Sequence, residues 1–417
     1  MDLKLPELNV NKPILKIFYL ALLLSLVIYS CAKKGLVSET YDKDFYQVKK
    51  FLPENSIQDL KTNFIVYSDN QAGWRVQHVF FDKSRWTSPK MFIFPFYELY
   101  LLANGFIGAI NGLRQVPDYG KSERLMMRDA IYSAAQKTDA AFILNIGDIN
   151  AYDGRRPDHW ETFLKENKQD HNLLNEIPYL PVIGNHEYAN DTLFGYPNYK
   201  AIFDYPRFYV IEFPQAAIYV VDSNFIIDQN QFIEDDMQDE LFFKWFVRKD
   251  SSDSLSWLEK KFVEYNKPLK IVAMHHPPVT FGKHYQNWHN PEFGNTLIEK
   301  RNKLLELFHK YNVDVVFSGH EHFYQYNTST FDDSKIHFFV GGGGGTPLRN
   351  PPDEATQSTI LKKYKIAGHD VQNISMSKIY HYYTVNIDND EMTIEVVKVN
   401  KNNEQPIEKI EIRSQRN

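Results

Sequence analysis

Five short polar segments of this 417-residue chain each follow an apolar run, and their residue types are those that bind metal ions. The runs FIVYS, AFILNI, YLPVI, LKIVAM and VDVVFS have the composition of buried strands. Polar residues beyond strand ends in an α/β sheet converge on one edge, so the segments are expected to meet. They are Asp69-Asn70-Gln71, Gly147-Asp148, Gly184-Asn185-His186-Glu187, His275-His276-Pro277-Pro278 and Gly319-His320-Glu321-His322.

Convergence of these segments would assemble carboxylates, an amide and several imidazoles without a thiolate. Such a ligand set favours manganese, iron or zinc over copper(I) or a structural zinc ion. The glycines of the GD, GNH and GH segments allow sharp backbone turns that direct the next side chain inward. We therefore predict a metal site at this sheet edge, and the paired histidines of GHEH, His320 and His322, are expected to belong to it.

The order of the segments resembles the calcineurin-like metallophosphoesterase superfamily, whose pattern is D-x-H, GD, GNH(E/D), H and GHxH. The resemblance runs from about Asn63 to the GGGGGTPL stretch at 341–348, and it is closest to bacterial acid-phosphatase-like members related to purple acid phosphatases. It implies an α/β fold of four layers, α/β/β/α, with two mixed sheets between helices. Helical spacing at 123–136, 255–265 and 297–311 and late strands at 335–340, 380–387, 392–399 and 407–412 agree with it.

The resemblance also implies a centre of two divalent or mixed-valence metal ions, whose identity as iron, zinc or manganese stays open. Asp148 would bridge the ions. Asp69 and His322 would bind the first ion, and Gln71 stands where the family has the histidine of D-x-H. The second ion would be held by Asn185, His275 and His320.

Gln71 is the clearest departure from the family pattern. An amide oxygen is a weaker neutral ligand than imidazole, so the first ion would be held less tightly unless another group joins it. Tyr152 is the candidate, because purple acid phosphatases supply a tyrosinate three positions beyond the GD aspartate. Tyr152 lies four beyond Asp148, so whether it is a ligand stays open.

Three further histidines receive roles from the resemblance. His186, next to Asn185, would stabilise transition-state charge or protonate the leaving oxygen, with Glu187 orienting it. His284 would contact the substrate phosphate, although His289 is close enough to be confused with it. His276 is expected to support its neighbour rather than bind metal.

The chemistry predicted from these motifs is phosphate ester hydrolysis. Two adjacent ions lower the pKa of a bridging water, so the resulting hydroxide can attack phosphorus in line. We expect an extracytoplasmic metal-dependent phosphohydrolase acting as a phosphomonoesterase. Two alternatives remain: a phosphodiesterase acting on nucleotides or lipid head groups, and a non-catalytic surface-binding lipoprotein on a degenerate phosphatase fold.

The N-terminal region has the pattern of a secretory signal. Lysines precede the apolar run IFYLALLLSLVIYS, which ends at Cys31, the only cysteine in the chain. We interpret residues 1–31 as a lipoprotein-type signal peptide with lipidation at Cys31, and an uncleaved anchor is the alternative. Either interpretation predicts an extracytoplasmic, membrane-anchored protein, periplasmic or on the cell surface.

Residues 32–60 are polar and predict a tether, and residues 61–413 predict the catalytic domain with insertions near 80–118 and 228–253. The first insertion contains an apolar stretch at 91–113, interpreted as a buried helical hairpin or a flap over membrane or substrate. The second is acidic and reads as a solvated face. A formal net charge of −6 without a basic stripe gives no support to nucleic-acid binding.

Overall fold

The computed structural model describes residues 35–51, 61–72, 120–150, 154–188, 192–227, 252–289, 296–401 and 403–414. The chain divides into two units, of which one, residues 1–34 and 74–119, lies outside the described residues. Cys31, the predicted signal segment, the insertion at 80–118 and residues 228–251 of the second insertion also fall outside them. Within the described part of the chain, no helix has the length and apolar character needed to cross a bilayer.

The first sheet is mixed and contains six strands in the order β13-β12-β11-β1-β2-β3. Strands β1, β2 and β3, the last of which forms one edge of the sheet, are parallel. Strand β11 pairs with β1 in the antiparallel direction. The strands are β1 (Lys61–Tyr67), β2 (Phe142–Asn145), β3 (Tyr179–Pro181), β11 (Tyr380–Asp388), β12 (Glu391–Asn400) and β13 (Asn403–Arg413).

The second sheet is also mixed and contains seven strands in the order β10-β8-β9-β7-β6-β5-β4. Strands β5, β6, β7 and β9 run parallel to one another, and β4, β8 and β10 are antiparallel to their neighbours. The strands are β4 (Tyr209–Glu212), β5 (Ala216–Val221), β6 (Leu269–Met274), β7 (Val315–Ser318), β8 (Tyr324–Phe331), β9 (Ser334–Gly341) and β10 (Asp370–Ser377).

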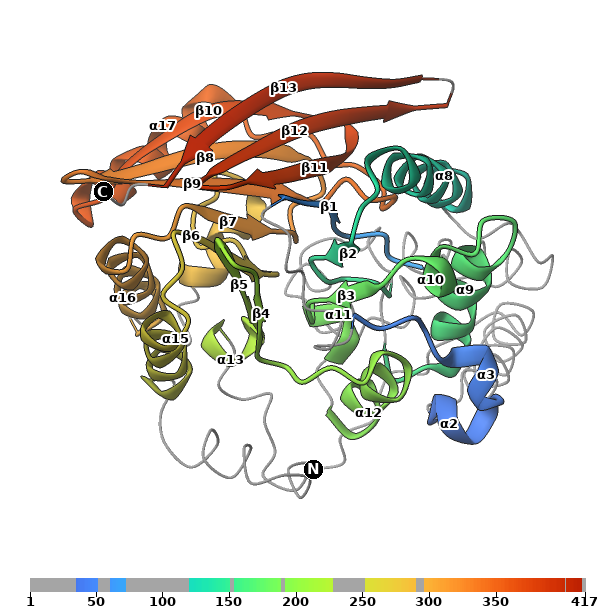
Figure 1. Cartoon of the computed structure of the whole chain (residues 1–417). Helices are drawn as coiled ribbons and strands as arrows, with labels where there is room; N and C mark the ends of the chain where they lie inside the picture. Colours follow the sequence, from blue (N-terminus) through green and yellow to red (C-terminus); the bar gives the residue numbers. More distant parts are fainter. Residues whose placement is uncertain are drawn as a thin grey trace, which may run out of the picture. The chain divides into compact units, whose positions relative to one another are not determined.

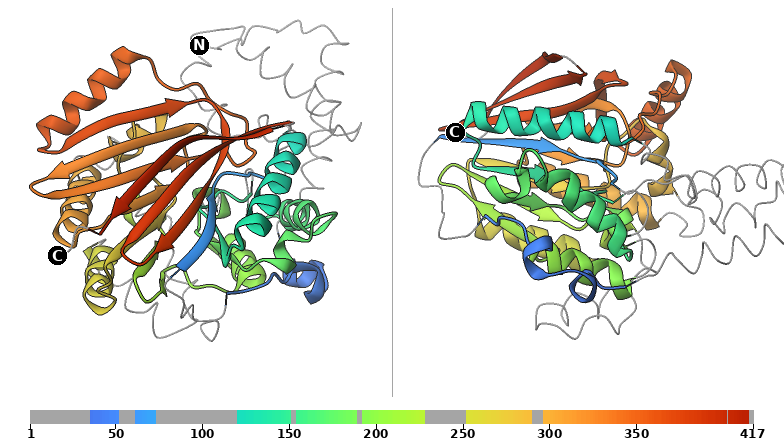
Figure 2. Two further views of the ribbon diagram at one scale, coloured as in Figure 1. Left: turned by 45° about the horizontal axis from the view of Figure 1, so that its top comes forward. Right: turned by 90° about the vertical axis from the view of Figure 1, so that its right-hand side faces the viewer.

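Helices cover the outer faces of both sheets (Figures 1 and 2). Helices α8, α9 and α12 supply apolar side chains to the core outside the first sheet, and α15, α16 and α17 do so outside the second. The helices are α2 (Val37–Thr40), α3 (Lys43–Tyr46), α8 (Lys121–Thr138), α9 (Pro157–Lys168), α10 (Leu173–Glu176), α11 (Asn185–Tyr188), α12 (Thr192–Phe203), α13 (Asn224–Ile227), α15 (Ser252–Glu264), η3 (Lys283–His289), α16 (Thr296–Lys310) and α17 (Glu354–Ile366).

The alternation of side chains along β1 shows why the layers form. Phe64 and Val66 point into the core between the sheets, whereas Ile65 and Tyr67 point into the core beneath the helices. Successive residues of a strand face opposite sides, so a strand that is apolar throughout must be covered on both. The predicted four-layer α/β/β/α fold is confirmed.

The segment at 35–51, which the sequence assigns to a tether, is packed onto the domain. Val37 is fully buried, and its backbone N–H donates to Asn198 Oδ1 at 2.7 Å. The backbone of Lys49 makes two hydrogen bonds to the domain, donating to Leu174 O at 2.7 Å and accepting from Tyr179 N at 3.0 Å. The polar composition concealed this because only a few apolar side chains anchor the segment.

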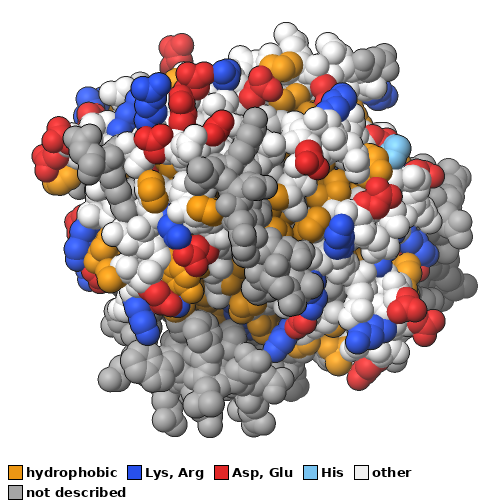
Figure 3. All heavy atoms as spheres, in the orientation of Figure 1, with side chains coloured by type: hydrophobic (Ala, Val, Ile, Leu, Met, Phe, Trp, Pro, Cys, Tyr) orange, Lys and Arg blue, Asp and Glu red, His pale blue; other side chains and the backbone are white. Residues whose placement is uncertain are grey.

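Charges of both signs are interspersed over the face of the molecule in Figure 3. On the described strands at the top of this view, β12 and β13, the pair Lys409 Nζ and Glu411 Oε1 lies 2.7 Å apart. The pair Arg413 and Glu391 lies 3.7 Å apart. Such exposed pairs contribute little to stability, and their mixture of signs agrees with the nearly balanced composition.

Candidate metal centre

The five predicted segments lie at the carboxyl ends of the parallel strands of both sheets. Asp69 follows β1, Asp148 follows β2, Asn185 follows β3, His275 follows β6 and His320 follows β7. Backbone hydrogen bonds continue the β1–β2 pairing past the strand ends, from Asp69 N to Gly147 O at 3.1 Å and from Gln71 N to Asp148 O at 3.0 Å. This continuation holds the polar residues of the two loops in register.

The backbone is left-handed at four of the predicted metal-binding positions. Asp69 has φ 59°, Gln71 47°, Asp148 53° and His320 72°. Residues other than glycine seldom adopt positive φ, and such conformations persist where the surroundings impose them, often at functional sites. Their concentration here indicates that the loops are shaped for side-chain placement at some cost in backbone energy.

The motif glycines owe their identity to two different causes. Gly147 has φ 89°, which glycine adopts without strain, as the sequence analysis expects. Gly184 and Gly319 do not have positive φ, so a left-handed backbone does not explain them. A Cβ on Gly184 would stand 2.3 Å from Asp148 Oδ1, and one on Gly319 would stand 2.5 Å from Asp69 Oδ2. These two glycines are needed because the carboxylates pack directly against the backbone.

One group of side chains, here called the second metal site, comprises Asp148, Asn185, His275 and His320. His275 Nε2 lies 3.2 Å from Asp148 Oδ1, 3.2 Å from Asn185 Oδ1 and 3.2 Å from His320 Nδ1. Ligand atoms about 2.1 Å from one ion stand about 3.0–3.4 Å apart, so these four atoms have the spacing of a single coordination sphere.

The other group, the first metal site, comprises Asp69, Gln71, Asp148 and His322. The Gln71 amide nitrogen is 3.3 Å from Asp148 Oδ2 and 3.3 Å from His322 Nε2, and His322 Nε2 is 3.7 Å from Asp69 Oδ1. Asp148 therefore contributes one oxygen to each site. The triads of Asp69, Asp148 and His322 and of Asp148, His275 and His320 each bring their ligand atoms within 4.8 Å.

Asp69 Oδ1 shows that the residues fit a bound cation. This oxygen is buried, and in the described part of the chain it has no hydrogen-bond partner. The other carboxylate oxygen accepts from Ser68 Oγ at 2.6 Å and from His320 N at 2.9 Å. An unpartnered buried carboxylate oxygen is costly unless a cation compensates it, so the donor set matches a pair of hard or borderline metal ions.

A family model described as calcineurin-like phosphoesterase matches residues 117–324. The chain belongs to this family. Purple acid phosphatase PPD1 from yellow lupin (Lupinus luteus) shares the fold, with 14% identity, a TM-score of 0.51 and coverage of 86% of this chain and 54% of the lupin chain. This chain thus spans about half the length of that enzyme.

A dimetal phosphatase from Danio rerio is also similar, at 13% identity and a TM-score of 0.43, covering 85% of this chain and 99% of its own. No curated protein sequence matches the chain. At these identities the structural likeness concerns the fold. The assignment of individual ligands in this chain therefore depends on its own geometry, and the ligand roles remain predictions.

Two of the predicted ligand histidines are oriented by a hydrogen bond at the ring nitrogen that faces away from the metal site. His275 Nδ1 is 2.8 Å from Ile146 O, and His322 Nδ1 is 3.2 Å from Pro347 O. A carbonyl partner fixes the protonated nitrogen and leaves Nε2 free to bind metal. His320 has the opposite orientation, with Nδ1 facing the second metal site and Nε2 2.7 Å from Asn287 Nδ2. The nitrogen and oxygen of the Asn287 amide can be exchanged in their assignment.

Burial and mutual charges shift the titration of these groups. Burial opposes ionisation of Asp148, but the neighbouring histidines hold its pKa well below the usual range. Burial favours neutral His275, yet Asp148 raises its pKa to about 9. Burial raises the pKa of Asp69 to about 7 and lowers the pKa values of His320 and His322 well below 6.5. A proton on His275 thus balances the negative charge of Asp148, and a bound cation would displace that proton.

His186 lies at the edge of the centre. Its Nε2 is 3.6 Å from Asp148 Oδ2, its backbone N–H donates to Asp148 Oδ1 at 3.1 Å, and its side chain is 23% exposed. An imidazole reachable from solvent and adjacent to the bridging carboxylate can face a substrate. The geometry is compatible with the predicted acid or charge-stabilising role.

Glu187 does not orient His186, contrary to the expectation from the sequence. Its fully buried carboxylate accepts backbone N–H groups of Gly184 at 2.7 Å, Ile149 at 2.9 Å, Asp148 at 3.0 Å and Asn150 at 3.1 Å. Burial and Asp148 raise its pKa to about 7, while these donors oppose the shift. Glu187 therefore ties the β2 and β3 loops together.

His284 lies beside the second metal site. Its ring centroid is 3.7 Å from that of His320, and its Nε2 is 2.6 Å from Arg349 Nη1. Arg349 also donates its backbone N–H to His322 O at 2.8 Å. Sequence reasoning missed Arg349 because it is a single residue after the glycine stretch, outside any motif. His289, the competing candidate, instead bonds to Tyr285 OH at 2.8 Å.

His276 packs beside the predicted ligands, with its ring centroid 4.6 Å from that of His320, and is hydrogen-bonded to Ser223. Its Nδ1 lies 2.8 Å from Ser223 Oγ, which also accepts the His276 backbone N–H at 3.0 Å. Tyr152 lies outside the described residues, so its ligand role stays a prediction.

The GGGGGTPL stretch forms a backbone turn against the centre, where Gly344 N donates to Ser68 O at 2.8 Å and Thr346 N to Asp69 O at 3.1 Å.

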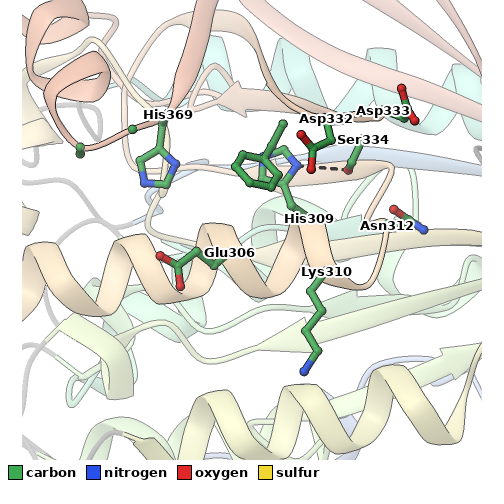
Figure 4. A pocket seen from close by; sticks show the side chains of 11 residues that line it. Glu306, His309, Lys310, Asn312, Asp332, Asp333, Ser334 and His369 are labelled. Atoms are coloured by element: carbon green, nitrogen blue, oxygen red, sulfur yellow. Dashed lines mark hydrogen bonds between the residues drawn. The ribbon is translucent and has the colours of Figure 1, made fainter.

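A separate cavity of about 510 Å³ lies at the far end of the β8–β9 hairpin (Figure 4). Its two histidines are already bonded: His309 to Ser334 Oγ and Ser329 Oγ, both at 3.1 Å, and His369 to Asn302 Oδ1 at 3.2 Å. Eight strand residues at about 3.3 Å each separate this end of the hairpin from the metal centre. The cavity therefore takes no part in the predicted chemistry.

Proposed function

We propose that the protein is a metal-dependent phosphomonoesterase with two divalent or mixed-valence ions, iron, zinc or manganese. The observation that carries the proposal is the sharing of Asp148 between two ligand groups, each with the spacing of one coordination sphere. Two adjacent ions, when bound, supply a nucleophile at neutral pH and compensate the charge of phosphoryl oxygens. The residues named above would hold them.

The chain's own groups would complete the chemistry. His186, beside Asp148, is placed to stabilise charge that develops on the phosphoryl group or to give a proton to the leaving oxygen. His284, hydrogen-bonded to Arg349, is placed to contact a phosphoryl oxygen. The guanidinium adds a permanent positive charge near the second metal site, and a dianionic monoester gains more from it than a monoanionic diester.

The test is elemental analysis of protein purified without added metal, joined to hydrolysis assays after chelation and metal add-back. Nitrophenyl phosphate and bis(nitrophenyl) phosphate separate the ester classes. The proposal expects about two ions per chain and faster hydrolysis of the monoester. Faster diester hydrolysis would support the phosphodiesterase alternative. Full metal content without turnover of either ester would support a non-catalytic binding lipoprotein.

We also propose an extracytoplasmic location with a lipid anchor at Cys31, supported by the lysines and apolar run that precede this cysteine. Cys31→Ser should abolish lipid labelling and leave the metal centre unaffected. Truncation before Asp42 should release soluble protein, but because Val37 is packed into the domain, truncation before Gly35 is the better control. A Cys31→Ser protein that remains membrane-bound at the wild-type mass would favour an uncleaved anchor.

A further inference from the structure

We propose that the cavity beside His284 is a subsite for the leaving group of the substrate, and that it selects alcohols or phenols carrying a second anionic group. The cavity has a volume of about 570 Å³. Its polar lining includes Lys283, Glu321, Arg349, Asn350, Thr356 and Lys363. The inference deepens the proposed function, since it assumes that a phosphoryl group binds at the metal centre.

Arg349 connects the cavity to the metal centre. Its side chain lines the cavity and contacts His284, while its backbone N–H is bonded to the carbonyl of His322. The His284 ring in turn lies against the ring of His320 in the second metal site, with their centroids 3.7 Å apart. A substrate whose phosphoryl group lies at the ions would therefore have the rest of the molecule adjacent to the Arg349 side of the centre.

The charge of the cavity points to an anionic ligand. Lys283, Arg349 and Lys363 contribute three positive charges, and Glu321 is the carboxylate among its lining residues. Within the described residues, none of the three cations has a carboxylate within ion-pair distance; Lys363 instead lies 5.4 Å over the Tyr285 ring. Glu321 interacts with Arg349 and Lys283 electrostatically, beyond ion-pair distance. Cations gathered at a concave surface without a carboxylate in direct contact raise the local concentration of anions.

Glu321 reduces this positive field only in part. Its carboxylate is fully buried behind Gly282, and a Cβ added to Gly282 would stand 2.3 Å from Glu321 Oε1. The carboxylate accepts hydrogen bonds from Thr280 Oγ1 at 3.1 Å and from His284 N at 2.8 Å. The two lysines, by contrast, are exposed and able to reach a ligand. The cavity thus presents cations to the solvent side and keeps its carboxylate beneath the backbone.

Binding of two non-hydrolysable phosphonates to metal-loaded protein tests the subsite. Phenylphosphonate and 4-carboxyphenylphosphonate differ by one carboxylate, and calorimetry measures both dissociation constants. The proposal expects the carboxylate analogue to bind about fivefold more tightly at low salt, and the preference to shrink as salt is added. Equal binding, or a preference for phenylphosphonate, overturns the subsite, as does failure of both compounds to bind.

Variants identify the residues responsible. The double variant Lys283→Gln with Lys363→Gln should bring the ratio of the two dissociation constants close to one. Lys362→Gln is the matched control, because Lys362 is exposed on the same helix α17 but does not line the cavity. An unchanged ratio in the double variant overturns the proposal even when the wild type shows the preference.

Kinetics with the corresponding esters separates this inference from the proposed function. Phenyl phosphate and 4-carboxyphenyl phosphate should show the same order in kcat/KM as the phosphonates show in affinity. If neither ester is hydrolysed while the phosphonate ratio and its loss in the double variant hold, the proposed function fails and the subsite stands. If both are hydrolysed with equal kcat/KM and the phosphonates bind equally, the function stands and the subsite is overturned.

Discussion

The side-chain hydroxyl of Thr346 donates a 2.7 Å hydrogen bond to Gln71 Oε1, across 275 positions of sequence. Gln71 stands where the family has a histidine, and its amide nitrogen faces the first metal site. An amide nitrogen cannot bind a metal ion, but exchange of the N and O positions would place Oε1 at the site. A hydroxyl can accept as well as donate, so Thr346 would hold the exchanged amide equally well.

Thr346→Val should therefore weaken the first metal site. The valine keeps the shape of threonine but offers the amide no partner, and loss of a group that orients a ligand costs about 10–100-fold in metal affinity. Thr346→Ser keeps the hydroxyl and is the control. The measurement is metal retained during titration with a chelator, and equal retention in Thr346→Val and wild type would show that Gln71 is not a ligand.

Gln71→His should tighten the first metal site by restoring the imidazole of the family pattern. The measurement is again retention of the ion against a chelator, compared with the wild type. The prediction assumes that Tyr152 is not a ligand. An iron(III) tyrosinate would give a visible charge-transfer band that Tyr152→Phe removes, and such a band in the wild type would contradict the assumption.

The strand ends could be predicted from sequence because each combines two strong local signals. An apolar run such as LKIVAM followed at once by His275 specifies both a buried strand and the polar residue that leaves it. Helices α8, α15 and α16 were foreseen from their apolar spacing for the same reason. These features depend on neighbours in the chain.

Features that depend on distant neighbours could not be predicted. Thr346, Asn287 and Arg349 are single polar residues whose roles arise only when the strand ends come together. Strands β8 and β10 were missed because polar residues such as those of YQYNTSTF give no clean alternation. Glu187 was misjudged because three of its four backbone donors come from the loop after β2, 37 to 39 positions away in the sequence.

Asp148→Asn should abolish hydrolysis and reduce bound metal. The carboxylate gives one oxygen to each ligand group, and an amide has one oxygen and no negative charge to offset two cations. Elemental analysis and nitrophenyl phosphate turnover measure the effect. Asp388→Asn, at an exposed strand end, is the control. Normal turnover with full metal in Asp148→Asn would reject the shared-carboxylate assignment.

His186→Ala should spare the metal and reduce kcat by about 10²–10⁴, the usual share of a positioned acid or base. The reason is that His186 approaches Asp148 Oδ2 at 3.6 Å but remains partly exposed, beside the ligands rather than among them. Metal content and kcat are measured on the same preparation. If the metal is lost together with turnover, His186 is a ligand.

The last prediction concerns acid stability and a histidine outside the metal centre. Burial lowers the pKa of His381 to about 4 in the folded protein, against about 6.5 in the unfolded chain. The folded state therefore holds His381 neutral, with Nδ1 3.1 Å from Ile379 O and Nε2 3.2 Å from Tyr383 OH. As the pH falls from 6.5 to 4, the unfolded chain takes up a proton at His381 and the folded protein does not. The free energy of unfolding therefore decreases over this range and is not affected by protonation of His381 above pH 6.5.

His381→Gln should make the free energy of unfolding less dependent on pH between 6.5 and 4. Glutamine cannot take up a proton, so between pH 7 and pH 4.5 the variant should lose about 2–3 kcal/mol less unfolding free energy than the wild type. Urea unfolding of metal-free protein at the two pH values gives the difference. His171→Gln is the control for replacing a histidine by glutamine, because the His171 side chain is 46% exposed. Parallel profiles for His381→Gln and wild type would mean that His381 is not held neutral by burial.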